Sequence, residues 1–415
     1  MTVHVIGAGI AGLVAALHLA EAGHAVLVHE SSPQAGGRCR ALPDGTDNGT
    51  HALIGANRAA LGFLERIGAL PGWVEPEPEG LPVLDLATGR AARVALSPLD
   101  WVRPELRPAG FSMGALLALA RLALPLRDRP VAEVMAAHPE FHRGFVDPLV
   151  VAALNTPSTE ASSRRLGAVL RRLRGRQATR LLVARNGLGP DLVVPALAAL
   201  ERAGARIRFG ARLRRLMQQG GRASALDFGE EVVPLGSEDA VVLAVPPWEA
   251  QRLLPHLPAP ASHSPIVNLH FAHPTSGPVR FLGLLDALCQ WVLVRPAGVS
   301  VTVSTGDAAA AAEPASLAPR AWAELRQAAL AFGVAGDWPA AVPPCRVVKE
   351  RRATPRHLPG PPPRPPRRPL PNLVLAGDWT VPDLPATIEA SVLSGEAAAR
   401  AIGAPRPASL VQRPA

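Results

Sequence analysis

The N-terminus carries a glycine pattern that restricts the chain to few folds. Residues 7–12, GAGIAG, lie directly between a short apolar strand and a segment with helical periodicity, residues 10–22. In such a unit Gly7 permits the tight turn, Gly9 lets the backbone approach a pyrophosphate, and Gly12 allows helix and strand to pack closely. The helix N-terminus then offers free N–H groups to phosphates. We therefore predict a Rossmann-like α/β domain that binds a dinucleotide.

An acidic residue ends the second predicted strand. Glu30 lies 18 residues after Gly12, where a carboxylate can accept hydrogen bonds from both ribose hydroxyls and disfavours a 2′-phosphate. The turn Gly36-Gly37-Arg38 follows, and in flavoproteins the backbone and guanidinium of such a turn face the pyrophosphate. A nicotinamide dehydrogenase has no need of this turn, so we predict FAD.

A third motif lies near the C-terminus. Asp378 follows Gly377 at the end of a buried strand, where its carboxylate can bind a ribityl hydroxyl. A helix that starts near Thr387 can direct its N-terminus at the flavin N1/O2 edge, where reduced flavin carries negative charge. Thr387 could equally act only as a helix cap. No second GxGxxG is present, which argues against a dedicated pyridine-nucleotide domain.

The predicted buried strands, near residues 3, 26, 241 and 374, are scattered over the whole chain. This scatter indicates one sheet domain built from separate segments, with an α+β substrate domain inserted between them. We expect the FAD-binding domain to comprise residues 1–58, 180–255 and 370–403. The substrate domain would comprise residues 59–179 and 256–345. A Pro/Arg-rich connector would cover residues 346–369, and a flexible tail would cover residues 404–415.

The net charge of +9 does not by itself indicate nucleic acid. Lys349 is the only lysine and arginine is abundant, which is typical of a compositional bias, and no nucleic-acid-binding motif accompanies it. The arginine clusters in 164–185 and 346–368 fit a solvated surface, anionic lipid or an acidic partner. Three distant cysteines predict neither a disulfide framework nor a metal site.

The chain shows no export or membrane-spanning signal, so we expect a cytoplasmic protein. Residues 110–126 form one strongly apolar run with a single charge, Arg121, that is suited to lie in a membrane interface. Trp101 precedes it, and an indole favours that depth. We expect peripheral contact with the inner face of the cell membrane, although the run also fits a buried helix.

Together the three motifs resemble the amine oxidase and phytoene desaturase superfamily of flavoproteins. A narrower resemblance to the hydroxysqualene dehydroxylase family rests on residues 47–56, DNGTHALIGA, the ALNTP stretch of 148–157, and residues 377–389. ALNTP lies outside the cofactor segments and is therefore more specific. The chain departs from that family at Asn57, where an aromatic residue is usual, and at Ala390, whose methyl group we expect near the flavin edge. These departures bear on the substrate rather than on FAD.

The resemblance implies non-covalent FAD and a reaction in which hydride from reduced flavin replaces the allylic hydroxyl of hydroxysqualene, giving squalene. It also implies a polyprenyl lipid substrate and contact with other squalene-pathway enzymes; the oligomeric state stays open. A carotenoid-type desaturase or isomerase is the alternative enzyme, and a non-catalytic flavin-binding partner is the alternative class. The residues assigned to the cofactor are Gly7, Gly9, Ala11, Gly12, Glu30, Gly36, Gly37, Arg38, Leu213, Gly377, Asp378, Thr387 and Ile388.

Three residues are candidates for catalysis, each with a structural alternative. His51 lies in the DNGTH turn, where it could be an acid or could only bond the backbone. Asn155 could orient the hydroxyl or cap a turn, and Glu389 could be an acid or a structural residue at a helix start.

Overall fold

The glycine motif joins a strand to a helix, as predicted. In the computed structural model, which describes residues 1–124 and 126–404, β1 (Thr2–Ile6) leads into α1 (Ile10–Glu21) and then β2 (Ala25–His29). Every residue of α1 except Glu21 is buried, which explains why its apolar residues run on instead of keeping to one face. Apart from Ala404, the expected flexible tail lies outside the described residues.

Five parallel strands from separate parts of the chain form one sheet in the order β18-β12-β1-β2-β8. The prediction that strands near residues 3, 26, 241 and 374 share a sheet is therefore confirmed. Two apolar clusters cover its two faces, as a parallel sheet requires. The remaining elements of this lobe are β8 (Arg206–Arg208), β12 (Ala240–Leu243), β18 (Leu373–Leu375), α2 (Arg58–Arg66), α8 (Val194–Arg202), α9 (Pro247–Leu253) and α12 (Ile388–Ile402), with the small sheet β9 (Arg215–Gln219), β10 (Arg222–Asp227) and β11 (Val232–Pro234).

A seven-stranded sheet forms the second lobe, in the order β17-β13-β16-β15-β14-β5-β6. Side chains alternate across it: Val267 and Leu269 pack against α11 (Pro314–Ala331), while Ile266 and Asn268 face a cavity between the lobes. Its strands and the small helix beside it are β5 (Leu81–Asp85), β6 (Arg90–Val94), β13 (His263–Phe271), β14 (Arg280–Leu285), β15 (Trp291–Arg295), β16 (Gly298–Val303), β17 (Cys345–Pro355) and α10 (Asp307–Ala311).

Strand β17 corrects the expected connector. We expected an extended connection from residue 346 onward, but residues 345–355 pair with β13 along its length. The run before Pro355 holds no proline, so its N–H groups are free for a sheet ladder. Of the expected connector, only the proline-rich residues after β17 run outside a sheet, on the way to β18.

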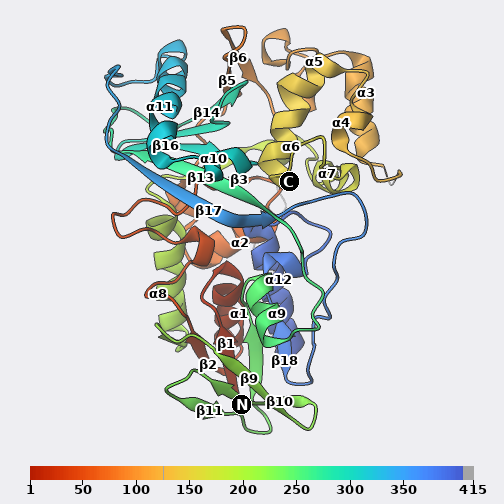
Figure 1. The fold of residues 1–415 in the computed structure, drawn as a ribbon, viewed down its shortest axis with the longest axis vertical. Helices are drawn as coiled ribbons and strands as arrows, with labels where there is room; N and C mark the ends of the chain where they lie inside the picture. The colour runs from red at the N-terminus through yellow and green to blue at the C-terminus, as the bar shows by residue number, and fades with distance from the viewer. Residues whose placement is uncertain (125, 405–415) are drawn as a thin grey trace, which may run out of the picture.

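Helices on the right of the upper lobe in Figure 1 complete the fold: α3 (Met113–Leu122), α4 (Val131–Val134), α5 (Pro139–Phe141), α6 (Asp147–Leu154) and α7 (Ser163–Leu170). A further small sheet joins β3 (Ala52–Ile54), β7 (Leu181–Ala184) and β4 (Trp73–Val74). Among the described residues of the apolar run 110–126, those of α3 are helical, and Ser112 caps this helix by accepting from the Ala115 N–H. Among the described residues, no helix is both long and apolar enough to cross a membrane.

Trp101 does not lie where an interfacial indole would. It is 2% exposed and packs edge-on against Phe111, Phe141 and Phe145, and its Nε1–H donates to the Ala95 carbonyl. The expectation of a membrane-facing Trp101 was therefore wrong, because the aromatic core of this helical layer takes up the ring.

Candidate active site

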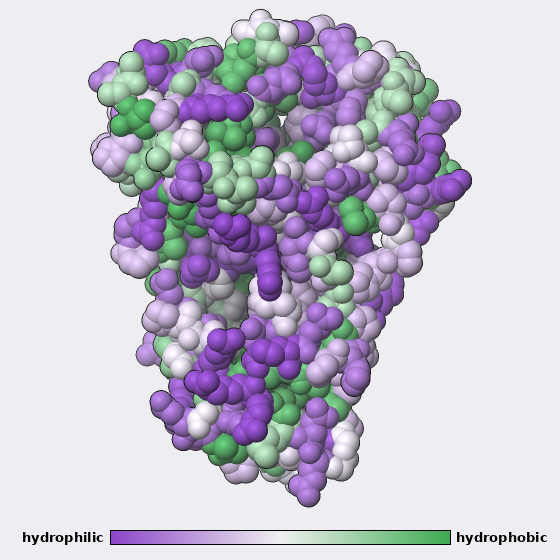
Figure 2. Space-filling model, in the orientation of Figure 1, coloured by the Kyte–Doolittle hydropathy of each residue, from purple (hydrophilic) through white to green (hydrophobic). Residues whose placement is uncertain are grey.

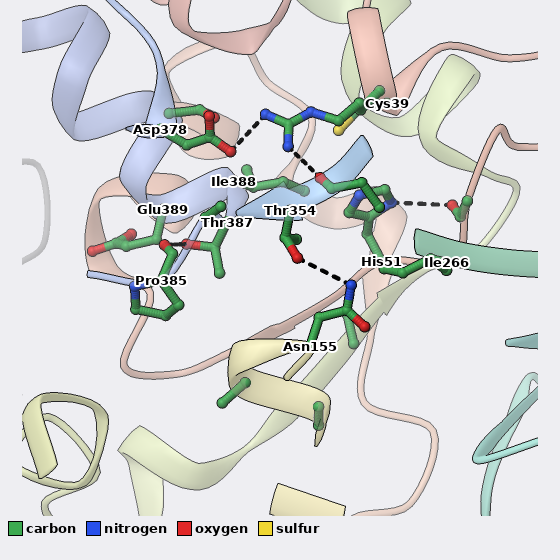
Figure 3. Close-up of a pocket in the computed structure, with 18 of the residues that line it drawn as sticks. Cys39, His51, Asn155, Ile266, Thr354, Asp378, Pro385, Thr387, Ile388 and Glu389 are labelled. Atoms are coloured by element: carbon green, nitrogen blue, oxygen red, sulfur yellow. Dashed lines mark hydrogen bonds and ion pairs between the residues drawn. The ribbon is translucent and has the colours of Figure 1, made fainter. Parts of the chain in front are cut away.

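One cavity of about 1120 Å³ reaches from the glycine motif to the upper lobe. All thirteen residues assigned to the cofactor line it except Gly12. Gly12 lies beneath the turn, where an added Cβ would come within 2.0 Å of the Gly7 carbonyl oxygen. His51, Asn155 and Glu389 line the same cavity (Figure 3).

The glycine turn fits a pyrophosphate. An added Cβ on Gly9 would meet nothing within 4 Å, so open space lies in front of the backbone at the start of α1. Gly9 is the N-cap of α1 and supplies no side-chain cap, which leaves the first N–H groups of the helix available to an anion. Gly36 (φ 105°) donates its N–H to the Ala8 carbonyl at 2.8 Å, which holds the GGR turn against this opening.

Glu30 is fixed at the end of β2 by backbone donors. Its Oε2 accepts from the Ala8 N–H at 2.7 Å, and its Oε1 accepts from the Ser32 N–H at 2.8 Å. The Ser31 hydroxyl also donates to Oε1 at 3.2 Å, so Oε2 is the oxygen that retains a further lone pair, and the carboxylate lines the cavity. Glu30 can therefore accept a ribose hydroxyl while it fixes the turn. Leu213 lines the cavity nearby, and its carbonyl accepts from Arg252 at 2.6 Å.

Arg38 joins three parts of the site. Its Nη2 lies 2.5 Å from Asp378 Oδ2, and its Nη1 donates to the Ala353 carbonyl of β17 at 2.6 Å (Figure 3). Burial opposes the charge of Arg38, but neighbouring Asp378 outweighs it and raises the pKa of the guanidinium. The GGR turn, the C-terminal motif and the second lobe thus meet at one side chain.

Thr387 is the N-cap of α12, as the alternative proposed. Its Oγ1 accepts from the Ala390 N–H at 3.2 Å. Capping does not exclude a cofactor role, because Thr387 and Ile388 also line the cavity. The N-terminus of α12 therefore faces the cavity with its positive dipole end.

His51 is a neutral imidazole in this environment. Burial lowers its pKa, and its Nδ1 lies 3.1 Å from the Gly49 carbonyl, so Nδ1 carries the hydrogen. Nε2 is then a free acceptor, on the side of the ring toward Thr354 (Figure 3).

Asn155 has its amide fully engaged. It ends α6 in the left-handed conformation (φ 43°), and its Oδ1 accepts from the Thr305 N–H at 2.6 Å. Its Nδ2 donates to the Ser264 carbonyl at 3.3 Å and to Thr354 Oγ1 at 3.0 Å. Because Thr354 Oγ1 accepts this bond, its own O–H is left to point into the cavity.

Sequence reasoning missed Thr354 and Asn268. Asn268 Oδ1 accepts from Thr302 Oγ1 at 2.9 Å, on the cavity side of β13. The alternation of apolar and polar residues in β13 could have identified Asn268. Thr354 lay within the expected connector, and no motif in the sequence indicated a functional role for it.

Glu389 is held between two helices and a loop. Its Oε2 accepts from the Ala60 N–H of α2 at 2.9 Å, and Arg172 Nη1 lies 3.3 Å from Oε1. Burial raises its pKa, while Ala60 and Arg172 partly oppose that rise. Both oxygens are thus engaged by the protein.

The far part of the cavity is apolar. It is lined by Leu81, Leu96, Leu119, Phe145, Phe281 and Trp291, among others. Polar side chains gather where this apolar chamber meets the glycine turn.

Of the two departures from family usage, Asn57 lines the cavity, whereas Ala390 is fully buried and does not. The Ala390 methyl group therefore does not reach the position expected for the flavin edge, because the Ala390 side chain packs inside the lobe.

Comparison with known proteins agrees with this geometry. The family model described as flavin containing amine oxidoreductase matches residues 10–403. The chain is 41% identical to a hydroxysqualene dehydroxylase of Rhodopseudomonas palustris and 38% identical to one of Sinorhizobium fredii, each over 96% of this chain and 97% of the relative.

Solved structures share the fold at low sequence identity. An oxidoreductase from Methanosarcina mazei superposes with a TM-score of 0.70 at 17% identity, covering 96% of this chain and 99% of that one. Cyclohexylamine oxidase from Brevibacterium oxydans gives 0.68 at 19% identity, covering 97% and 98%.

Proposed function

Because this chain belongs to the flavin-containing amine oxidoreductases and, among them, to the hydroxysqualene dehydroxylase family, we propose that it converts hydroxysqualene to squalene. The observation that carries this proposal is one continuous cavity, which joins a dinucleotide-binding turn to an apolar chamber with a few polar groups at the junction. Such a cavity suits a long hydrocarbon that bears one polar group at the reacting carbon.

We propose that the flavin is FAD, held without a covalent bond. The start of α1 and the GGR turn would hold the pyrophosphate, Glu30 the ribose, and Asp378 the ribityl chain. Of the three cysteines, only Cys39 lines the cavity. Burial raises its pKa to about 12, so it stays a thiol and is a poor nucleophile toward the flavin.

The protein's own side chains exclude water and place a hydrogen-bond donor at the reacting carbon. A reduced flavin, when bound, would supply two electrons and one hydrogen to the carbon that loses its hydroxyl, and one proton would leave with that hydroxyl as water. The apolar chamber excludes water from the cation that forms when the C–O bond breaks. Thr354 donates its O–H to the leaving hydroxyl oxygen, and Asn155 fixes Thr354 for this task.

We propose His51 as the group that delivers the proton. Its Nε2 faces the cavity, and burial makes its protonated form scarcer but more acidic than ordinary imidazolium. Glu389 instead positions α12 against α2, since both of its oxygens are engaged.

We further propose that each lobe binds one of the two ligands. The lobe with the parallel sheet binds the cofactor, and the lobe with the seven-stranded sheet binds the lipid substrate. Since the substrate is a polyprenyl lipid, we place the enzyme in the cytoplasm, at the inner face of the cell membrane, next to the enzymes that supply and consume that lipid.

The test is turnover by the purified protein. We expect a yellow protein that releases FAD on denaturation and, when reduced anaerobically, converts hydroxysqualene to squalene. Reduction of the bound flavin by phytoene, with no product from hydroxysqualene, would instead indicate a desaturase. A flavin-loaded protein that turns over no polyprenyl substrate would indicate a non-catalytic partner, and a protein that cannot be loaded with FAD would refute the cofactor assignment.

A further inference from the structure

Helix α3 separates the apolar chamber from the outside of the protein. Leu116 and Leu119 on one side line the cavity. Met113 and Leu117 on the other side are 65% and 54% exposed. An exposed helix normally presents polar residues outward, so an apolar outer face indicates something that covers it.

The cavity reaches the surface beside this face. Ala120 of α3 and Pro98 both line the cavity and are both exposed. Leu99 and Val102 follow Pro98, and Leu124 and Leu126 follow α3; all four are more than half exposed. We call these four residues, with Met113 and Leu117, the apolar rim. In Figure 2 green side chains lie among purple ones at the upper right margin, where Figure 1 places α3.

The segment after α7 holds the rim together. Arg171 donates to the Ala123 carbonyl at the end of α3 at 2.8 Å. Arg176 Nε lies 2.8 Å from Asp100 Oδ1, next to Leu99. These contacts bring α3, the loop 98–102 and the segment after α7 together around the opening of the cavity.

Positive charge predominates around the apolar rim. Residues 163–180 contain seven arginines and no aspartate or glutamate. Arg121 and Arg127 lie on or just after α3, and both are exposed. Apolar side chains flanked by arginines complement a bilayer that has an apolar interior and anionic headgroups.

We propose that the apolar rim docks on an anionic phospholipid bilayer, and that the lipid substrate passes from the bilayer into the cavity between α3 and the loop 98–102. Met113 and Leu117 insert below the headgroups, and the exposed Arg121, Arg127 and Arg174 bind phosphates. The inference rests on the proposed lipid substrate, and it adds the surface that docks and the path the lipid takes.

The test is flotation of the FAD-loaded protein with vesicles of phosphatidylcholine, alone or mixed with phosphatidylglycerol. We expect binding to the mixed vesicles that weakens as salt is raised. Met113→Glu with Leu117→Glu should weaken it about tenfold or more, because two inserted apolar side chains are lost. Leu330→Glu with Val194→Glu, which changes equally exposed apolar residues elsewhere, should bind like the wild type.

Turnover separates docking from chemistry. The Met113/Leu117 variant should keep its FAD and its turnover of substrate in detergent micelles, and lose turnover of substrate embedded in vesicles. Wild-type protein that does not float with anionic vesicles at low salt, or a Met113/Leu117 variant that floats like the wild type, would overturn the docking surface. Vesicle binding without turnover in micelles would count against the proposed reaction and leave the docking surface intact.

Discussion

Arg38 and Asp378, which are 340 positions apart in the chain, form an ion pair of 2.5 Å at the junction of the two lobes. The same guanidinium donates to the Ala353 carbonyl of the seven-stranded sheet. Two of the three cofactor motifs are therefore coupled to each other and to the strand that carries Thr354.

This coupling predicts non-additive mutations. Arg38→Ala and Asp378→Asn should each weaken FAD binding about tenfold, the scale of one charge-assisted contact. The double variant should lose less than the two single losses combined, because each change already breaks the shared pair. FAD titration by fluorescence quenching measures all four affinities. Additive losses would show that the two side chains act independently.

Glu30 should contribute to FAD affinity through its charge. Glu30→Gln keeps one acceptor oxygen for the turn, and we expect it to weaken FAD binding by about 1.5–3 kcal/mol. Glu30→Ala should also lower the melting temperature of the apoprotein, because the Ala8 and Ser32 N–H groups lose their acceptor. Unchanged FAD affinity in both variants would mean that the ribose contact is misassigned.

Thr354 should matter for the rate and little for folding. Thr354→Val keeps the shape but removes the hydroxyl, and we expect kcat to fall about tenfold, which corresponds to one lost hydrogen bond of roughly 1.4 kcal/mol. Thr354→Ser should restore most of the rate. Single-turnover measurement with pre-reduced enzyme isolates this step from flavin reduction. Equal rates for the serine and valine variants would exclude a role for the hydroxyl.

His51 should give the reaction a pH dependence. Its pKa lies below the ordinary histidine value, so the protonated fraction grows as pH falls below about 6.5. We expect the single-turnover rate to rise over that range in the wild type. His51→Gln should be slower and flat with pH. A wild-type rate that is independent of pH would assign proton delivery to another group.

His357 should make stability depend on pH. Burial, aided by Arg165, lowers its pKa to about 3, whereas in the unfolded chain it titrates near 6.5. Between these values the unfolded state binds the proton and the folded state does not, so this site removes about 1.4 kcal/mol of unfolding free energy per pH unit as pH falls.

Denaturant titrations at several pH values measure this effect. His357→Gln should remove this share of the pH dependence, while His18, His29 and His270, whose pKa values burial lowers to about 4, keep theirs. The exposed His256→Gln, a matched control, should leave it unchanged. Equal slopes in all three proteins would mean that His357 is protonated in the folded state.

The sequence by itself determined the cofactor half of this protein. A tight glycine turn, a helix start and a carboxylate at a strand end are local backbone features, so their spacing alone located Gly9, Glu30 and Gly377. Continuous apolar runs identified the strands of the parallel sheet, because such strands are buried on both faces.

Only the tertiary structure decided which distant residues meet. Thr354 contacts Asn155 across 199 positions and Glu389 contacts Ala60 across 329, and neither partner carries a local signal for the other. The same holds for α3, whose apolar run fitted both a buried and an exposed helix. Its two faces became distinct only when one packed over the cavity, because periodicity reports that a face is apolar and packing determines what that face contacts.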